Sequence, residues 1–387
     1  MISFIIYLFI EHLIVIRRVR RIPLRICVTG TRGKSSLTRL LAASLREEGF
    51  EVIGKTTGSR AKVIFPDGRE KEITRHGPAS LLEVRNFLKL ASRLRVKAFV
   101  AELMSIHPES LLTESLGFLK PNYLLITNIR FDHTEEMGSS EEEIAECFAS
   151  AITENSTVML LEEEFSPLLE ERARKMKARV IKIPLNIFNT EYEKFKPSFL
   201  EFKENLALAL GLMEFLGIKK EKALRAMENA TPDFGSLRVW EARLPEPSPK
   251  FYFVNVFAAN DTLSTRIALS RIPQAFFNKK RIIGILNLRP DRGERTVQWA
   301  KAIREGVFPE IKEIWVNGIH SHAFTRMLGA MKDIRLRRVK EKSAQELMSA
   351  LFRKVAENTV IVGMGNIKGL GSELVEFWEE KGVPYGL

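Results

Sequence analysis

The sequence predicts an α/β protein built on parallel sheets, in which an apolar helix precedes a larger domain and then a smaller one. Apolar, β-branched runs alternate with amphipathic segments along the 387 residues, a pattern typical of βαβ units. A connector containing Pro and Gly near residue 235 separates two such series. The first residues instead form an almost unbroken apolar stretch that ends in arginines.

That N-terminal segment, residues 1–21, resembles a membrane segment. Residues 2–16 are apolar apart from a Ser, a Glu and a His, and four arginines follow within residues 17–21. The basic flank predicts that the rest of the chain stays in the cytoplasm. The segment is shorter than the ~20 residues that a helix needs to cross a bilayer, and Glu11 would need a partner in lipid. We expect a thin span, an interfacial helix or packing on another membrane subunit, with a buried core helix as the alternative.

A phosphate-binding loop opens the larger domain, which we place at 22–234. The strand predicted at 24–29 runs into GTRGKSS, and an amphipathic helix follows up to Gly49. Backbone N–H groups at the start of a helix can hold phosphate oxygens, and Lys34 adds a positive charge there. Ser35 stands where such loops place a Mg²⁺ ligand. Strand, loop and helix in this order predict nucleotide binding.

Further elements complete the two predicted sheets. In the larger domain we expect strands at 97–104, 122–129 and 157–161, helices at 82–94 and 141–152, and a hairpin that turns at Asp67-Gly68. In the smaller domain, 235–387, we expect strands at 237–244 and 251–258, followed by three strand-helix pairs that begin at 281–286, 313–317 and 359–363.

Polar side chains follow two of the strands of the larger domain. Glu102 ends one strand, and Asn128, Asp132 and His133 follow the next. Because the carboxyl ends of parallel strands meet at one edge of a sheet, these groups are expected beside the phosphate-binding loop. Carboxylate and imidazole groups there can complete the coordination of a metal.

These motifs resemble the Mur ligase superfamily, which includes the folylpolyglutamate synthases. The resemblance is carried by TGTRGKSS, by Glu102, by TNIRFDH and by the connector GSLRVWE, which contains Arg238. It implies an ATP-dependent ligase that joins a carboxylate to an amine through an acyl phosphate. NVFAAN departs from the superfamily, because Asn255 and Ala259 stand where those ligases carry an Asp and a His.

Within the superfamily, the chain is similar to the ligase subunits of poly-γ-glutamate synthases. The similarity rests on the order of GKTTGS, DHTEEMG, FAANDTLST, NLRPDRGERT and VGMGNIKG along almost the whole chain. Phe148 falls about where many Mur ligases have a carbamylated Lys, and the loop begins too early for a domain that holds a UDP-sugar. A UDP-muramoyl substrate is therefore not expected. The implied fold is a Mur-ligase-like central domain with a smaller Rossmann-like C-terminal domain.

The resemblance implies ATP with Mg²⁺ or Mn²⁺ and a specific set of site residues. The implied catalytic residues are Lys34, Glu102, His133 and Arg238. The implied nucleotide-binding residues are Gly30, Thr31, Arg32, Gly33, Lys34, Ser35, Ser36, Asn128 and Arg238. The implied metal ligands are Ser35, Glu102 and His133. The candidate substrate-binding residues are His76, Arg289, Arg292 and Arg295, and weaker candidates for guiding an anionic chain are Lys55, Arg60, Lys62 and Arg75.

The expected partners follow from the charge and from the resemblance. A net charge of +12 suits an anionic partner. The resemblance implies glutamate, an anionic poly-γ-glutamate chain and small integral membrane subunits at the cytoplasmic face of the cell membrane. Self-association is compatible with the sequence, and no nucleic acid is expected. Two alternatives stay open: a related ligase that acts on another acceptor, and a membrane-attached P-loop ATPase without ligase activity.

Overall fold

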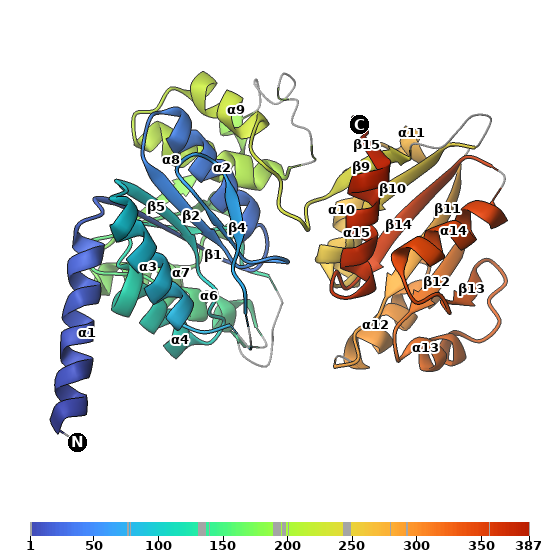
Figure 1. Cartoon of the computed structure of the whole chain (residues 1–387), viewed down its shortest axis with the longest axis horizontal. Helices are drawn as coiled ribbons and strands as arrows, with labels where there is room; N and C mark the ends of the chain where they lie inside the picture. Colours follow the sequence, from blue (N-terminus) through green and yellow to red (C-terminus); the bar gives the residue numbers. More distant parts are fainter. Residues whose placement is uncertain are drawn as a thin grey trace. The chain divides into compact units, whose positions relative to one another are not determined.

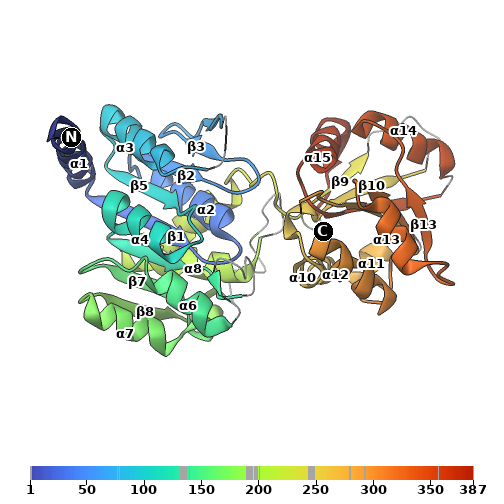
Figure 2. The same cartoon turned by 90° about the horizontal axis from the view of Figure 1, so that it is seen from below.

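The chain forms two compact units. The computed structural model describes residues 2–75, 77, 79–130, 137–138, 140–188, 195, 199, 201–242, 249–278, 280–291, 293–355 and 357–386. The first unit contains Met1–Pro197 and Glu201–Asp233, and the second contains Ser198–Leu200 and Phe234–Leu387. In each unit, helices cover both sides of one sheet (Figures 1 and 2). The predicted α/β class with two largely parallel sheets is confirmed.

The first unit is built on a sheet whose described strands run in the order β4-β3-β2-β5-β1-β6-β7-β8. The strands are β1 (Leu24–Thr29), β2 (Val52–Thr56), β3 (Lys62–Ile64), β4 (Glu70–Glu72), β5 (Ala98–Glu102), β6 (Tyr123–Ile126), β7 (Thr157–Leu161) and β8 (Arg179–Ile183). Among these described strands, only the β2–β3 and β3–β4 pairs are antiparallel. The parallel strands β5, β1 and β6 therefore end at the same edge, where β1 leads into the phosphate-binding loop.

Helices on the two faces of this sheet bury apolar side chains. The α-helices are α1 (Ile2–Arg20), α2 (Lys34–Glu47), α3 (Leu82–Leu94), α4 (Pro108–Leu112), α6 (Glu141–Ala149), α7 (Pro167–Lys175), α8 (Lys203–Phe215) and α9 (Lys220–Glu228). The shorter turns are the π-helix η1 (Thr113–Leu119) and the 3₁₀ turns η2 (Glu162–Glu164) and η3 (Leu185–Phe188). Helices α3, α6 and α7 pack on one face of the sheet, whereas α2 packs against α8 and α9.

Helix α1 lies beside α3 and is buried along part of its length. Val15 and Val19 belong to the core of the first unit, and Glu11 forms an ion pair with Arg85 of α3. Toward its N-terminus α1 extends past the rest of the unit (Figure 1), and Phe9 there is 61% exposed. In the described part of the chain, no helix combines the length and the apolar character needed to cross a membrane.

The second unit has a sheet whose described strands run in the order β13-β12-β11-β14-β10-β9-β15. The strands are β9 (Arg238–Ala242), β10 (Phe251–Asn255), β11 (Arg281–Asn287), β12 (Glu313–Asn317), β13 (Arg335–Arg338), β14 (Thr359–Gly365) and β15 (Gly382–Pro384). The five strands from β13 to β10 are parallel, and β9 and β15 are antiparallel additions.

Two helical layers cover this second sheet, as Figure 2 shows. The helices are α10 (Thr262–Ser270), α11 (Gln274–Phe277), α12 (Gly293–Arg304), α13 (Ser321–Leu328), α14 (Ala344–Lys354) and α15 (Leu370–Lys381), with the 3₁₀ turn η4 (Phe257–Ala259). The first four pack on one face and the last two on the other. The connections that leave β11 and β14, which are neighbours, therefore pass to opposite faces. Such a switch point is where doubly wound sheets bind ligands.

Most of the predicted elements are present. The helix at 82–94 and the hairpin through Asp67-Gly68 are confirmed, whereas the helix expected at 141–152 ends at Ala149. Strands β2, β8, β13 and β15 were not predicted. The last three lie at the edge of a sheet and carry polar or short sequences, so they lack the apolar run by which a buried strand is recognised. β2 lies inside its sheet, and Gly54 and Lys55 interrupt its apolar run.

Candidate active site

The loop after β1 has the geometry that phosphate binding requires. Gly30 and Gly33 have φ angles of 122° and 85°, which side chains other than Gly rarely adopt. A Cβ atom on Gly30 would come within 2.1 Å of Thr127 Oγ1, so no larger residue fits there. Helix α2 begins at Lys34, directly after Gly33. The N-terminus of α2 therefore lies at the loop, as an anion site needs.

Residues that follow β6 hold this loop in place. The N–H of Arg32 donates to Asn128 Oδ1 over 3.0 Å, and Asn128 Nδ2 donates to the Arg32 carbonyl over 3.0 Å. Thr31 Oγ1 donates to the carbonyl of Arg130 over 3.0 Å. The amide of Asn128 thus shapes the loop. The contact of Asn128 with the nucleotide stays a prediction.

The ammonium group of Lys34 lies over the loop. Its Nζ donates to the Gly30 carbonyl over 2.6 Å and to the Thr31 carbonyl over 3.2 Å. These contacts place a positive charge at the point where the backbone N–H groups of the loop begin. A phosphate oxygen bound to the loop would meet both kinds of donor.

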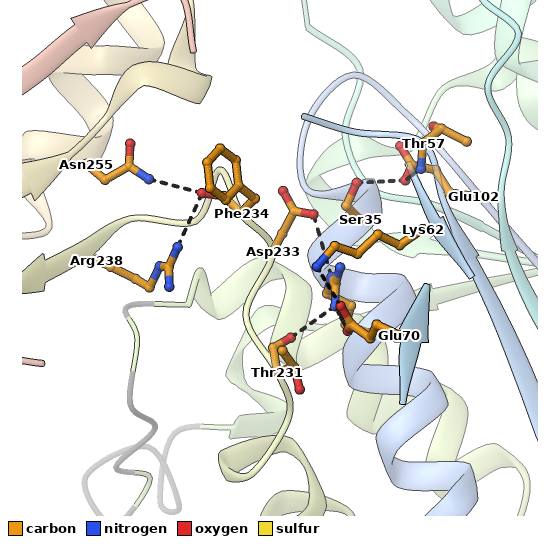
Figure 3. A network of polar contacts seen from close by, with 11 residues as sticks. Ser35, Thr57, Lys62, Glu70, Glu102, Thr231, Asp233, Phe234, Arg238 and Asn255 are labelled. Carbon is orange, nitrogen blue, oxygen red and sulfur yellow. Dashed lines mark hydrogen bonds and ion pairs between the residues drawn. The ribbon is translucent and has the colours of Figure 1, made fainter. Parts of the chain in front are cut away.

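The two described residues that were predicted to bind a metal lie in direct contact. Ser35 Oγ donates to Glu102 Oε2 over 2.7 Å, and the Thr57 N–H donates to the same oxygen over 2.7 Å (Figure 3). Glu102 is only 3% exposed. A Cβ on Gly58 would come within 2.4 Å of Ser35 Oγ, so the loop after β2 closes over this pair. Hydroxyl and carboxylate oxygens are the ligands that Mg²⁺ and Mn²⁺ prefer, and the pair fits a divalent cation.

Other predicted site residues lie outside the described part of the chain. They are His133, the third predicted metal ligand, with its neighbour Asp132, and the predicted substrate residues His76 and Arg292. Among the residues that are described, no three or more His, Cys, Asp or Glu side chains form a group that could hold a metal. The complete metal site therefore remains a prediction.

A buried carboxyl group behind the loop was not found from the sequence. Glu201 accepts hydrogen bonds from Asn205 Nδ2 over 2.8 Å and from the Phe202 N–H over 2.9 Å, and also from the Ser36 side chain. Burial raises the pKa of Glu201 to about 7, although these hydrogen bonds oppose the shift. Asn205 lies against the loop, because a Cβ on Gly33 would meet its Oδ1 at 2.5 Å. No local motif marks these residues, which lie about 170 positions after the loop.

Helix α2 also holds the end of the first unit through Arg39. This buried guanidinium forms ion pairs with Glu70 of β4 and with Asp233, the latter at 3.6 Å between Nε and Oδ1. It also donates to the carbonyl of Thr231 over 3.5 Å. The last residues before the second unit are thus fixed to the helix that carries the phosphate-binding loop.

Three cations that were considered as guides for an anionic chain have other roles. Lys55 is 1% exposed within β2, where burial lowers the pKa of its ammonium group while Glu114 and Glu102 oppose that shift. Lys62 pairs with Glu70 at 2.9 Å, and Arg75 pairs with a neighbouring carboxylate on α3. Lys55 in particular is wrongly placed for guiding a chain, because β2 lies between β3 and β5 and the side chain is enclosed.

In the second unit, Arg238 and Asn255 hold the connector. Arg238 Nη1 lies 2.5 Å from Glu379 Oε1, and its guanidinium carbon lies 4.7 Å from the centre of the Trp240 ring. Asn255 Nδ2 donates to the carbonyl of Phe234 over 3.2 Å (Figure 3) and to that of Ser236 over 3.1 Å. Asn255, which replaces an Asp of the resembling ligases, therefore acts here as an anchor for the connector backbone.

The two described arginines of NLRPDRGER lie in a loop and in the helix that follows it. Arg289 forms a two-pronged contact with Asp291 in its own loop. Arg295 lies in the first turn of α12, which begins at Gly293, and its Nη1 is 3.9 Å from Asp261. Their role in holding substrate carboxylates stays a prediction.

Two families match the sequence over most of its length. The Mur ligase middle domain matches residues 28–214, and the Poly-gamma-glutamate synthase CapB C-terminal domain matches residues 243–381. The chain is 31% identical to the PGA synthase CapB of Bacillus subtilis (strain 168) over 364 residues, which cover 93% of this chain and 91% of that protein. It is 32% identical to the capsule biosynthesis protein CapB of Bacillus anthracis over 380 residues, with coverage of 95% and 79%.

Solved structures share the fold at low sequence identity. The bifunctional folylpolyglutamate synthase/dihydrofolate synthase of Yersinia pestis, solved with AMPPNP and Mn, has a TM-score of 0.68 at 12% identity and coverage of 96% and 92%. MurF from Acinetobacter baumannii has a TM-score of 0.65 at 15% identity, with coverage of 94% and 79%. The folylpolyglutamate synthase of Thermotoga maritima has a TM-score of 0.60 at 13% identity, with coverage of 97% and 96%.

The fold, the loop and the family matches together define an ATP-dependent carboxylate–amine ligase of the Mur ligase type. The resemblance drawn from the motifs is confirmed at this level. More narrowly, the chain belongs to the CapB family of poly-γ-glutamate synthases, because CapB relatives match it along nearly its whole length.

Proposed function

We propose that this protein forms the amide bonds of poly-γ-glutamate. A γ-carboxylate oxygen attacks the γ-phosphorus of ATP, the bond to ADP breaks, and an acyl phosphate forms. A glutamate amine then attacks the acyl carbon, loses a proton and displaces phosphate. The observation that supports this most directly is the contact of Ser35 with Glu102 at the phosphate-binding loop.

In the first unit, which we assign to nucleotide binding over 22–234, the loop and Lys34 would hold the phosphates. The N–H groups at the start of α2 and the Lys34 ammonium offer positive charge to the transferring phosphoryl group. Ser35, Glu102 and His133 would hold Mg²⁺ or Mn²⁺. A divalent cation bound there would neutralise charge on the phosphate oxygens.

In the second unit, which we assign to the amino-acid substrate over 235–387, arginines would hold carboxylates. Arg289 donates two hydrogen bonds to the Asp291 carboxylate. A substrate carboxylate that takes the place of Asp291 could accept the same two hydrogen bonds. Arg292 and Arg295 are proposed to share this role. We assign Arg238 to the nucleotide and His76 to the anionic chain.

Residues 1–21 are proposed to hold the protein at the cytoplasmic face of the cell membrane. Among the described side chains of α1, the exposed large apolar ones are Ile6, Phe9, Ile10, Leu13 and Ile14. The arginines that follow suit anionic lipid headgroups. Small integral membrane subunits are the proposed partners of this helix, and self-association is compatible with it.

The test follows labelled glutamate and phosphate in the same reaction. A poly-γ-glutamate ligase incorporates one labelled glutamate for each phosphate released, and phosphate release depends on glutamate. Hydrolysis without incorporation would identify a P-loop ATPase that lacks ligase activity. Incorporation that needs a folate or a peptide acceptor would instead identify a related ligase.

A further inference from the structure

A concentration of positive charge lies at one edge of the second unit. Residues 326–342 contain seven Lys or Arg and two acidic residues. Six of the seven cations are exposed, and we call them the β13 strip: Arg326, Lys332, Arg335, Arg338, Lys340 and Lys342. The seventh, Arg337, stacks on Trp315 at 3.7 Å and pairs with Glu341. The strip therefore keeps an excess of positive charge toward solvent.

The strip follows the outermost strand of its sheet. β13 pairs only with β12 in the described sheet and lies at its end, beside α13 (Figure 1). Neighbouring side chains of a strand point to opposite faces, so Arg335 and Arg338 project on either side of the edge. Lys340 and Lys342, which are also exposed, follow the strand in the sequence. An extended anion could meet these charges one after another.

Hydrogen bonds connect this strip to the loop that we assign to substrate carboxylates. His320 Nε2 lies 2.9 Å from the carbonyl of Pro290, the residue that follows Arg289. Arg338 Nη1 lies 3.0 Å from His322 Nδ1, and because Arg can only donate, that nitrogen accepts. The N-terminal end of α13 thus joins the Arg289 loop to the strip within one unit.

We propose that the β13 strip is a track for the poly-γ-glutamate chain outside the catalytic site. This inference rests on the proposed function, because that function supplies a polymer with one carboxylate per residue. Exposed cations each bind a carboxylate weakly, but several in line hold a polyanion, and salt weakens the attraction. Of the cations that the sequence suggested for guidance, Lys55 is buried, and Lys62 and Arg75 pair with carboxylates.

The competing explanation is that these charges only protect an edge strand from pairing with another chain, a common use of Lys and Arg at edges. Under that explanation, replacing the charges would promote aggregation and leave affinity for the polymer unchanged. The two explanations therefore predict different results for the same variant.

The experiment compares two triple variants of the full-length protein with equal loss of charge. The strip variant is Arg335→Gln/Arg338→Gln/Lys340→Gln. The control is Lys89→Gln/Arg93→Gln/Lys97→Gln, whose three residues are exposed on the first unit. Binding of size-defined poly-γ-glutamate of about 50 residues is measured without ATP at two salt concentrations. We expect the strip variant to lose at least tenfold in affinity and the control less than twofold.

Three further readouts make the result decisive. Melting temperatures show that both variants are folded, and Arg335→Lys/Arg338→Lys should retain the affinity of the unmodified protein. The KM for a one- to three-residue acceptor should not change in the strip variant, because we propose the track to lie outside the catalytic site. Equal losses of polymer affinity in both triple variants, or no loss in either, would overturn the track. Tighter binding of RNA or of anionic vesicles than of polymer of equal charge would overturn it as well.

The same measurements separate this inference from the proposed function. Polymer binding that depends on the strip, in a protein that incorporates no glutamate, would refute the ligase reaction and leave the strip as a binding surface. If ligation is normal and the strip variant binds the polymer as tightly as the unmodified protein does, the track is refuted and the proposed function is not.

Discussion

Ser35 Oγ and Glu102 Oε2 lie 2.7 Å apart, although 67 residues separate them in the sequence. Ser35 belongs to the first turn of α2 and Glu102 is the last residue of β5. The contact exists because β1 and β5 are parallel neighbours that end at the same edge of the sheet. It brings two oxygen atoms of the kind that Mg²⁺ and Mn²⁺ prefer to the start of the helix that follows the phosphate-binding loop.

Glu102→Gln should raise the Mg²⁺ or Mn²⁺ concentration needed for half-maximal ATP hydrolysis by at least about tenfold, because it removes a charged ligand. Titration of each metal at saturating ATP measures the shift. Glu114→Gln is the matched control: this carboxylate is also buried and accepts from the Met104 and Ser105 N–H groups. It should lower stability and leave the metal requirement unchanged. An unaltered metal requirement in Glu102→Gln would remove Glu102 from the site.

Lys34→Ala should abolish ATP turnover and leave the melting temperature nearly unchanged. The ammonium group donates to the carbonyls of Gly30 and Thr31, and we propose that it supplies charge to the transferring phosphate. Steady-state hydrolysis and thermal unfolding check the two halves of this prediction. Lys89→Ala, on an exposed face of α3, serves as the control and should affect neither. Turnover near that of the unmodified protein would contradict the nucleotide assignment.

Glu201 should make stability depend on pH between about 4.5 and 7. Burial raises the pKa of this carboxyl group from 4.5 to about 7, and the nearby Asp233 adds to the shift. The folded state thus holds a proton that the unfolded chain releases, so stability is greatest at low pH and falls as pH rises toward 7. At 1.36 kcal/mol per pKa unit, the loss amounts to roughly 3 kcal/mol.

Urea unfolding at several pH values measures this contribution, and Glu201→Gln should flatten it, since the amide does not titrate. The amide can still accept from Asn205, so the variant should fold. A slope that persists unchanged in Glu201→Gln would assign the pH dependence to another group.

Arg238→Ala and Arg289→Lys should impair different substrates. Arg238→Ala should raise the KM for ATP, and Arg289→Lys should raise the KM for glutamate, because Lys keeps the charge and loses the planar two-pronged donor. Glu379→Gln is the control for Arg238, since it removes the ion pair and keeps the guanidinium. Initial rates over both substrates provide the comparison. If both variants changed the KM for ATP alone, our division of labour between the units would be wrong.

The two ends of α1 should respond differently to substitution. Replacing Phe9, Ile10 and Leu13 with Ser should shift the protein from the membrane fraction to the soluble fraction without lowering the melting temperature, because these side chains are exposed. Val19→Ala should destabilise the fold by roughly 1–2 kcal/mol, because Val19 is buried in the core. Cell fractionation and thermal unfolding test the pair. If Val19→Ala released the protein from the membrane fraction and the Ser variant did not, the proposed membrane contact would be contradicted.

The sequence by itself determined the elements whose signals are local. The phosphate-binding loop could be predicted because its strand, glycines, Lys34 and helix are contiguous, and each residue type has one physical reason to be there. Glu102 could be predicted because it ends an apolar strand, and parallel strands end at one edge. The Asp67-Gly68 hairpin was equally local, since the turn and both of its strands lie within eleven residues.

Only the tertiary structure decided which distant residues support that loop and which cations face solvent. Glu201 and Asn205 reach the loop because α8 packs against α2, a contact that no short pattern encodes. Lys55 looks like a surface cation in the sequence, but β2 lies inside the sheet and encloses it. The β13 residues form an edge strand, and this position leaves Arg335 and Arg338 exposed. Whether a side chain is buried depends on which distant segments of the chain pack against it, and a short stretch of sequence does not contain that information.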